Sequence, residues 1–182
     1  MALTPPQLAT LKAFIAADPV LNGQPVDGDG LNFIADALNA QAGPAFSVWR
    51  SSTPAASLFN SITWANLTPA DAPDGSALFT NRAAACRAKQ GSLQILLQGQ
   101  SSVASKHPNI RQGFQDALTN VPSGVAGANL GAGWATCKTA MIRTATVAEK
   151  LFATGTGTPA APADLGYEGN ITANEVDTAR RS

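Results

Sequence analysis

The sequence has little charge and few of the side chains that most often carry catalysis. Lys, Arg, Asp and Glu make up 13% of the 182 residues, about half the usual share. His107 is the single histidine, and there are two cysteines. Histidine is the usual general base near neutral pH, and one histidine with two cysteines is too few for a four-ligand zinc site within one chain. We therefore expect neither an enzyme nor a metal-binding protein.

Long apolar runs are missing as well. No stretch approaches the roughly 20 apolar residues that a membrane-spanning helix needs, and the opening Met1 to Pro6 lacks the basic and apolar regions of a secretory signal. We expect a protein that avoids membranes and is made in the cytoplasm. In that reducing compartment Cys86 and Cys137, at apolar positions of predicted helices, are expected to be buried free thiols rather than a disulfide.

Small and apolar side chains fill the place of the missing charges. Hydrophobic residues reach 45%, with many alanines. This composition fits a helical core of small residues, and it also fits surfaces that other chains cover; the two are compatible. The length corresponds to one domain, or to one domain with an arm.

The net charge of zero hides an uneven distribution. Residues 1–80 carry a net charge of −4, residues 81–150 carry +6, and the remaining residues carry −2. A basic middle between acidic ends could steer head-to-tail contacts between identical copies or face nucleic acid, although it could equally be an ordinary mixed surface.

Helical periodicity dominates the pattern, and it predicts an all-α bundle of five or six helices. Thr4-Pro5-Pro6-Gln7 is typical of a helix start, and Asp18-Pro19 predicts its end. Further helices are expected after residues 27–30, after Thr53-Pro54, over residues 76–97, from Pro108 to Leu118, and over residues 134–152, the longest.

The C-terminal part reads differently from the rest. Residues 1–152 are expected to form the helical bundle domain, and residues 153–182 a flexible Gly-Thr-Pro-Ala spacer followed by a docking arm. Residues 165–171 resemble a strand that pairs only when a partner supplies an edge. The arm should be removable without unfolding the bundle. The expected partner-binding residues are Tyr167, Glu168, Ile171, Val176 and Arg180.

One acidic run invites a calcium interpretation. If Gly30 takes the sixth position of a calcium loop, the first ligand position falls on Pro25 and the last on Asp36. Because the first ligand is missing and the last is shortened, an Asp27 cap on the following helix explains the run better. The Gly155 to Thr158 segment lacks the lysine of a phosphate-binding loop. We therefore expect no metal and no cofactor.

A basic cluster is the one nucleic-acid candidate in the sequence. Arg82, Arg87 and Lys89 fall on one predicted helix, and Arg82 and Lys89 are seven residues apart and share a face. Without interleaved aromatic residues or a DNA-binding motif, a solvated face is the default, and a DNA-facing or inter-subunit surface is the alternative.

Three segments carry a resemblance to a known family. Residues 148–157, Tyr167-Glu168-Gly169-Asn170-Ile171-Thr172 and the ending Glu175-Val176 to Ala179-Arg180 resemble the C-terminal end of a family of small structural proteins of tailed bacteriophages. The opening residues 2–19 and Val48-Trp49-Arg50 are similar to the N-terminal half of the same family. The likeness spans the chain except for residues 66–105.

Within that family, size and helical content resemble the head-to-tail adaptor class, whose helical subunits ring the portal and send a C-terminal arm towards it. The resemblance implies a ring in the virion neck, assembled in the host cytoplasm, with the portal protein and neighbouring tail or neck proteins as partners and non-specific contact with genome DNA in the lumen. The alternatives are a tail-completion or capsid-associated virion protein, a small DNA-binding regulator and, last, an enzyme.

Overall fold

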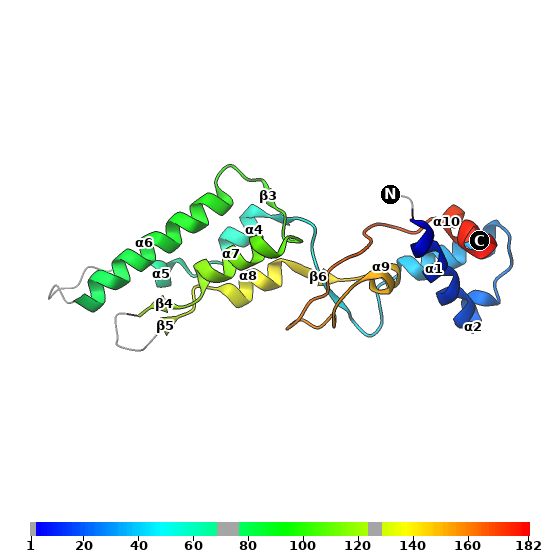
Figure 1. Ribbon diagram of the computed structural model, residues 1–182, viewed down its shortest axis with the longest axis horizontal. Coiled ribbons are helices and arrows are strands. Elements are labelled where there is room, and N and C mark those ends of the chain that lie inside the picture. Colours follow the sequence, from blue (N-terminus) through cyan, green and yellow to red (C-terminus); the bar gives the residue numbers. More distant parts are fainter. Residues whose placement is uncertain (1–2, 69–76, 124–128) are drawn as a thin grey trace. The chain divides into compact units, whose positions relative to one another are not determined.

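The computed structural model describes residues 3–68, 77–123 and 129–182, which belong to two compact units (Figure 1). Unit 1 combines Met1–Val48 with Thr144–Ser182, and unit 2 is the intervening Trp49–Arg143. The chain leaves unit 1 within strand β1 (Ser47–Trp49) and re-enters it within strand β6 (Ile142–Thr144). Unit 1 is therefore discontinuous in sequence, whereas unit 2 is one continuous segment.

Unit 1 is a helical cluster built from both ends of the chain. Its helices are α1 (Pro5–Ala17), α2 (Pro19–Asn22), α3 (Gly28–Asn39), α9 (Val147–Phe152) and α10 (Ala173–Arg181). Helix α10 lies against both α1 and α3. Full burial of a Leu, Ile or Val side chain contributes about 1.5–3 kcal/mol, so the three helices depend on one another. The shared core contains Leu11, Ile15, Ile34, Leu38, Ile171, Val176 and Ala179.

The ends of α1 confirm the sequence prediction. Gln7 Oε1 accepts a hydrogen bond from the Thr4 backbone N–H at 2.9 Å, and Pro5 takes the first helical position. The helix ends before Asp18, whose extended backbone suits a residue that precedes proline. Asp18 then caps α2, since its Oδ1 accepts from the Val20 N–H at 2.9 Å.

Unit 2 holds its own core. Its elements are β2 (Thr53–Pro54), α4 (Ala55–Ser61), α5 (Trp64–Leu67), α6 (Ala77–Leu97), β3 (Ser102–Val103), α7 (Pro108–Leu118), β4 (Val121–Pro122), β5 (Asn129–Leu130) and α8 (Trp134–Ala140). Helix α6 runs along α7 (Figure 1). Leu58, Leu67, Leu93, Phe114, Leu118, Cys137 and Met141 are buried together between the helices.

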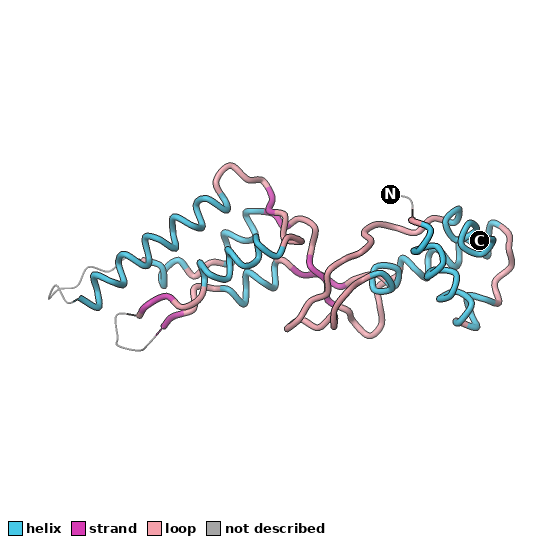
Figure 2. The backbone as a smooth tube through the Cα atoms, in the orientation of Figure 1, coloured by secondary structure: helices cyan, strands magenta, loops and turns pink. Residues whose placement is uncertain are grey.

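The expectation of an all-α bundle is wrong. The described part of the chain is mostly helical, but it also contains three two-stranded sheets, in which β1 pairs with β6, β2 with β3 and β4 with β5 (Figure 2). The antiparallel pairs β2–β3 and β4–β5 match only two residues each, for example Thr53 with Val103 and Val121 with Leu130. Strands of two residues carry no alternating pattern, so periodicity could not reveal these two pairs.

The longest predicted helix, residues 134–152, is also absent. The segment instead forms α8, strand β6 and α9. Thr146 accepts a hydrogen bond from the Glu149 N–H at 3.2 Å, and Glu149 Oε2 accepts one from the Thr146 N–H at 3.0 Å. This capping box starts a new helix and ends the continuity of the predicted one. The predicted apolar stripe is consequently shared among separate clusters, with Cys137 in unit 2 and Ala148 in unit 1.

The predicted division at residue 152 differs from the observed one, which lies at Val48/Trp49 and Arg143/Thr144. The segment after α9 is hydrogen-bonded within unit 1: Thr154 and Asp164 exchange two backbone hydrogen bonds of 2.9 Å, and Gly157 O accepts from the Ser47 N–H at 2.6 Å. Gly157 has φ +67, and a Cβ there would overlap the Phe46 ring. The spacer is therefore part of the fold of unit 1.

Candidate functional site

The five predicted partner-binding residues all belong to unit 1. Tyr167, Ile171 and Val176 lie in its core with 6%, 2% and 0% of their surface exposed. Glu168 is exposed and Arg180 is half-buried. The three apolar side chains thus already have partners within the chain, contrary to the expectation that a neighbour buries them.

The backbone around Ile171 is paired by a side chain instead of a strand. The Asn39 amide donates to Ile171 O and accepts from the Ile171 N–H, both at 2.8 Å. Tyr167 donates its hydroxyl to Asn170 O at 2.9 Å. Burial raises the pKa of Tyr167, with smaller contributions from Glu175 and Glu149. Asn39 therefore takes the place of the partner edge that the sequence led us to expect.

Arg180 is engaged within unit 1. Its Nη1 donates to Gln24 O at 3.0 Å and to Pro25 O at 3.4 Å, which ties α10 to the loop before α3. Arg180, Arg181 and Lys12 line a hollow of about 570 Å³. Arg181 is itself paired with Asp177, with a Nε to Oδ1 distance of 2.6 Å.

The basic cluster on α6 divides into two kinds of residue. Arg82 is 7% exposed and donates to Thr68 O at 2.6 Å, at the C-terminal end of α5. Lys89 donates to Asp116 O at 2.5 Å and to Thr119 O at 2.8 Å, at the C-terminal end of α7. Both cations satisfy carbonyls that a helix end leaves open. Arg87 is exposed, and no hydrogen bond or ion pair holds it within the described residues.

The acidic run at residues 27–30 caps a helix. Asp27 Oδ1 accepts from the Gly30 N–H at 2.9 Å, at the start of α3. Within the described ranges there is no group of three or more His, Cys, Asp or Glu side chains placed to hold a metal ion. His107, the histidine of the chain, is exposed at the N-cap position of α7.

Both cysteines are buried free thiols, which confirms the sequence prediction. Cys137 lies in the core of unit 2. Burial raises the pKa of the Cys137 thiol to about 11, and a hydrogen bond with Ser61 opposes this shift. A thiol held protonated in this way is a poor nucleophile.

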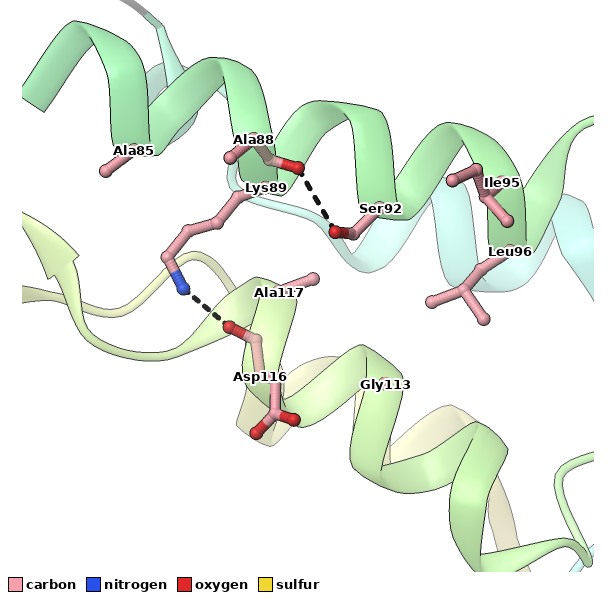
Figure 3. A pocket seen from close by; sticks show the side chains of 9 residues that line it. All are labelled: Ala85, Ala88, Lys89, Ser92, Ile95, Leu96, Gly113, Asp116 and Ala117. Carbon is pink, nitrogen blue, oxygen red and sulfur yellow. Dashed lines mark hydrogen bonds between the residues drawn. The ribbon is translucent and has the colours of Figure 1, made fainter.

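A hollow lies between α6 and α7 (Figure 3). It measures about 590 Å³, and small side chains such as Ala85, Ala88 and Ala117 form much of its wall. The Lys89 side chain crosses one end of it towards Asp116 O, and Ile95 lies at the other end with 82% of its surface exposed. Asp116 faces this groove with its main-chain O, and its carboxylate, which accepts from Gln112 Nε2 at 2.7 Å, points away from α6 (Figure 3).

A second groove of about 450 Å³ lies where α6 meets α4 and α5, and we call it the aromatic groove. Phe59 and Trp64 form one side, with ring centroids 4.8 Å apart and an interplanar angle of 43°. Trp64 Nε1 donates to Phe59 O at 3.2 Å, which fixes the indole. Its full lining is Phe59, Trp64, Gln90, Leu93, Gln94, Leu97 and Gln98. The lining holds no carboxylate.

Helix α3 carries an exposed aromatic residue on its outer side. Phe33 is 47% exposed, while Ile34 and Leu38 of the same helix are fully buried. Asp29 and Asp36 precede and follow Phe33 by four and three residues, so all three lie on one face, which we call the α3 face. Both carboxylates are exposed, and neither has a hydrogen-bond or ion-pair partner among the described residues.

Neither the α3 face nor the aromatic groove was predicted from the sequence. Phe59 is 52% exposed, although Leu58 beside it in the same helix is fully buried. The spacing Asp29, Phe33, Asp36 was a signal for the α3 face, since an aromatic residue between two carboxylates on one helix face is out of place in a core. No local pattern marked the aromatic groove, because its walls come from three separate helices.

The two units differ sharply in charge. Unit 2 contains eight Lys and Arg against three Asp and Glu, a net charge of +5, and unit 1 contains four against nine, a net charge of −5.

No helix in the described part of the chain is long and apolar enough to span a membrane. Comparisons of the chain with protein-family models, with curated proteins and with solved structures find no match.

Proposed function

We propose that this protein is a structural subunit of a tailed-phage virion, an adaptor at the head-to-tail junction that forms a ring on the portal and is not an enzyme. Its resemblance to small virion proteins in residues 148–157 and 167–180 supports this role. Its partners would be further copies of itself, the portal protein and neighbouring neck or tail proteins.

The observation that carries the proposal is the opposite net charge of the two units, −5 and +5. A symmetric contact of unit 1 with unit 1, or of unit 2 with unit 2, brings like charges together. A contact of unit 1 with unit 2 of the next copy brings unlike charges together. Such head-to-tail contacts generate rings when the rotation closes, so the charge distribution favours ring-like assembly.

The proposed docking surfaces are those around the exposed aromatic residues Phe33 and Phe59, and not the buried face of the C-terminal segment. Tyr167, Ile171 and Val176 belong to the core of unit 1, whereas Phe33 and Phe59 are exposed. Aromatic side chains are enriched where proteins contact one another. The C-terminal segment would then support docking by keeping α3 in place.

The test is a phage that lacks the gene for this protein. We expect DNA-filled heads and separate tails in electron micrographs, with infectivity restored by the gene supplied in trans. Labelled protein should appear at the neck of the complemented virions. Full infectivity without the gene would overturn a structural role, and label on the capsid surface or the distal tail would favour another virion component over the adaptor.

Binding to DNA provides a separate outcome. If the positive charge of unit 2 serves duplex DNA, affinity should fall steeply with salt, by about 0.9 log unit per phosphate contact for each log unit of salt. Tight, salt-dependent binding by the purified chain, together with normal virions from the deletion phage, would replace the proposal with a DNA-binding role.

A further inference from the structure

We propose that the α3 face of one copy docks in the aromatic groove of the next copy. This inference deepens the proposed function and rests on its ring assembly. It identifies the partner of both surfaces as a second copy of this chain, and it makes Phe33 the central side chain of the contact.

The apolar part of the contact is an aromatic side chain entering an aromatic pocket. Phe33 projects from α3 with 47% of its surface exposed. The groove offers the tilted Phe59–Trp64 pair on one side and the α6 residues Leu93 and Leu97 on the other. Aromatic side chains prefer tilted or edge-on partners at centroid distances of about 4.5–7 Å. The aromatic groove has a volume of about 450 Å³, which has room for one phenyl ring with neighbouring atoms.

The polar part of the contact is complementary in charge. Asp29 and Asp36 flank Phe33 and have no partner among the described residues. On α6, Arg87 lies seven residues before Gln94 and therefore on the same side of the helix as the glutamine rim of the groove. A carboxylate placed beside Phe33 can accept hydrogen bonds from the Arg87 guanidinium and the Gln94 amide.

The α6/α7 groove is a poorer receptor for the same face. Asp116 lies in its wall, and Lys89 already donates both to Asp116 O and to Thr119 O. An incoming carboxylate would meet a cation that already uses two of its three donors, and an incoming phenyl ring would meet small side chains such as Ala85 and Ala88 instead of aromatic rings. The aromatic groove has neither disadvantage.

The geometry of association follows from where the two surfaces lie. The α3 face belongs to unit 1 and the aromatic groove to unit 2. Each copy therefore carries one knob, which is the α3 face with Phe33, and one receptor, which is the aromatic groove. A copy bound through its knob still has its receptor free. Further copies can therefore add to a pair joined by one such contact, as a ring requires.

The experiment uses two complementary variants of the full chain, Phe33→Asp and Phe59→Asp. Each keeps one intact surface and places a carboxylate on the other. In sedimentation velocity at low ionic strength, the wild-type chain should grow beyond a dimer with rising concentration, and each variant alone should stay monomeric. An equimolar mixture should form a dimer and nothing larger, because one intact knob and one intact receptor remain.

Two further substitutions control for added charge on an exposed apolar residue. Val26→Asp alters unit 1 at a residue that is 54% exposed, and Ile95→Asp alters α6 at a residue that is 82% exposed. Both should associate within about twofold of the wild-type chain, whereas the Phe33 and Phe59 variants should lose at least about tenfold in affinity. Melting temperatures close to that of the wild type show that each variant is folded.

Several results would overturn the inference. The first is a wild-type chain that remains monomeric at about 1 mM. The second is a mixture of the two variants that remains monomeric, and the third is an Ile95→Asp variant as defective as Phe59→Asp. The deletion phage is independent of them. If the two variants form the expected 1:1 dimer but the phage does not need the gene, the adaptor role is refuted and the docking contact stands.

Discussion

At the scale of single residues, the Asn39 side chain joins the end of α3 to the C-terminal segment. Its amide satisfies both backbone polar groups of Ile171 at 2.8 Å. We expect Asn39→Ala to lower the free energy of unfolding of unit 1 by about 2–3 kcal/mol, because a buried N–H and C=O lose their partners together. Urea denaturation measures the change. Asn32→Ala, at an exposed position of the same helix, is the control and should change it by less than about 0.5 kcal/mol.

Cys137 predicts a loss of stability at alkaline pH. Its pKa is about 11 in the folded chain against 9.0 for the unperturbed thiol, because burial disfavours the thiolate. A pKa raised by folding contributes stability that is complete below pH 9 and is lost as the pH rises through 11, on the order of 2 kcal/mol. In denaturant titrations from pH 8 to 11, Cys137→Ala should lose less stability than the wild-type chain. Parallel curves for the two proteins would contradict this assignment.

At the scale of elements, Lys89 stabilises the C-terminal end of α7 through Asp116 O and Thr119 O. We expect Lys89→Met to cost about 1–2 kcal/mol, since it keeps the length of the side chain but removes the charge and both hydrogen bonds. Arg87→Met, two residues away on α6, is the matched control and should leave the melting temperature unchanged while it weakens association of copies. Equal losses of stability in the two variants would show that the α7 end does not need Lys89.

Elements with a local chemical signal could be predicted from the sequence, and those fixed by distant contacts could not. Helix starts with a local chemical signal were predictable, as Thr4 with Gln7 and Asp27 with Gly30 demonstrate. The break in residues 134–152 was missed because its apolar stripe fits one long helix, although the Thr146 and Glu149 spacing carried the signal for a new start. The position of the C-terminal segment could not be predicted, because only α1 and α3 together create the surface on which Ile171 and Val176 pack.

At the scale of the whole molecule, the discontinuous unit 1 makes the C-terminal segment indispensable to it. We expect removal of residues 160–182 to unfold unit 1, since the core loses Tyr167, Ile171 and Val176 at about 1.5–3 kcal/mol for each fully buried side chain. This replaces the expectation of a removable arm. Unit 2 should keep its protection in hydrogen exchange. A truncated chain that protects α1 and α3 as well as the full chain does would refute this prediction.

The two units are completed at different times while the chain is synthesised, because unit 1 is discontinuous. Trp49–Arg143 leaves the ribosome as one continuous segment and can fold while synthesis continues, whereas α1 and α3 must wait for Ala173–Arg181. The receptor groove is then finished before the knob that fits it. Newly made chains on one polysome therefore present grooves without competent knobs, which delays their association until each chain has been released.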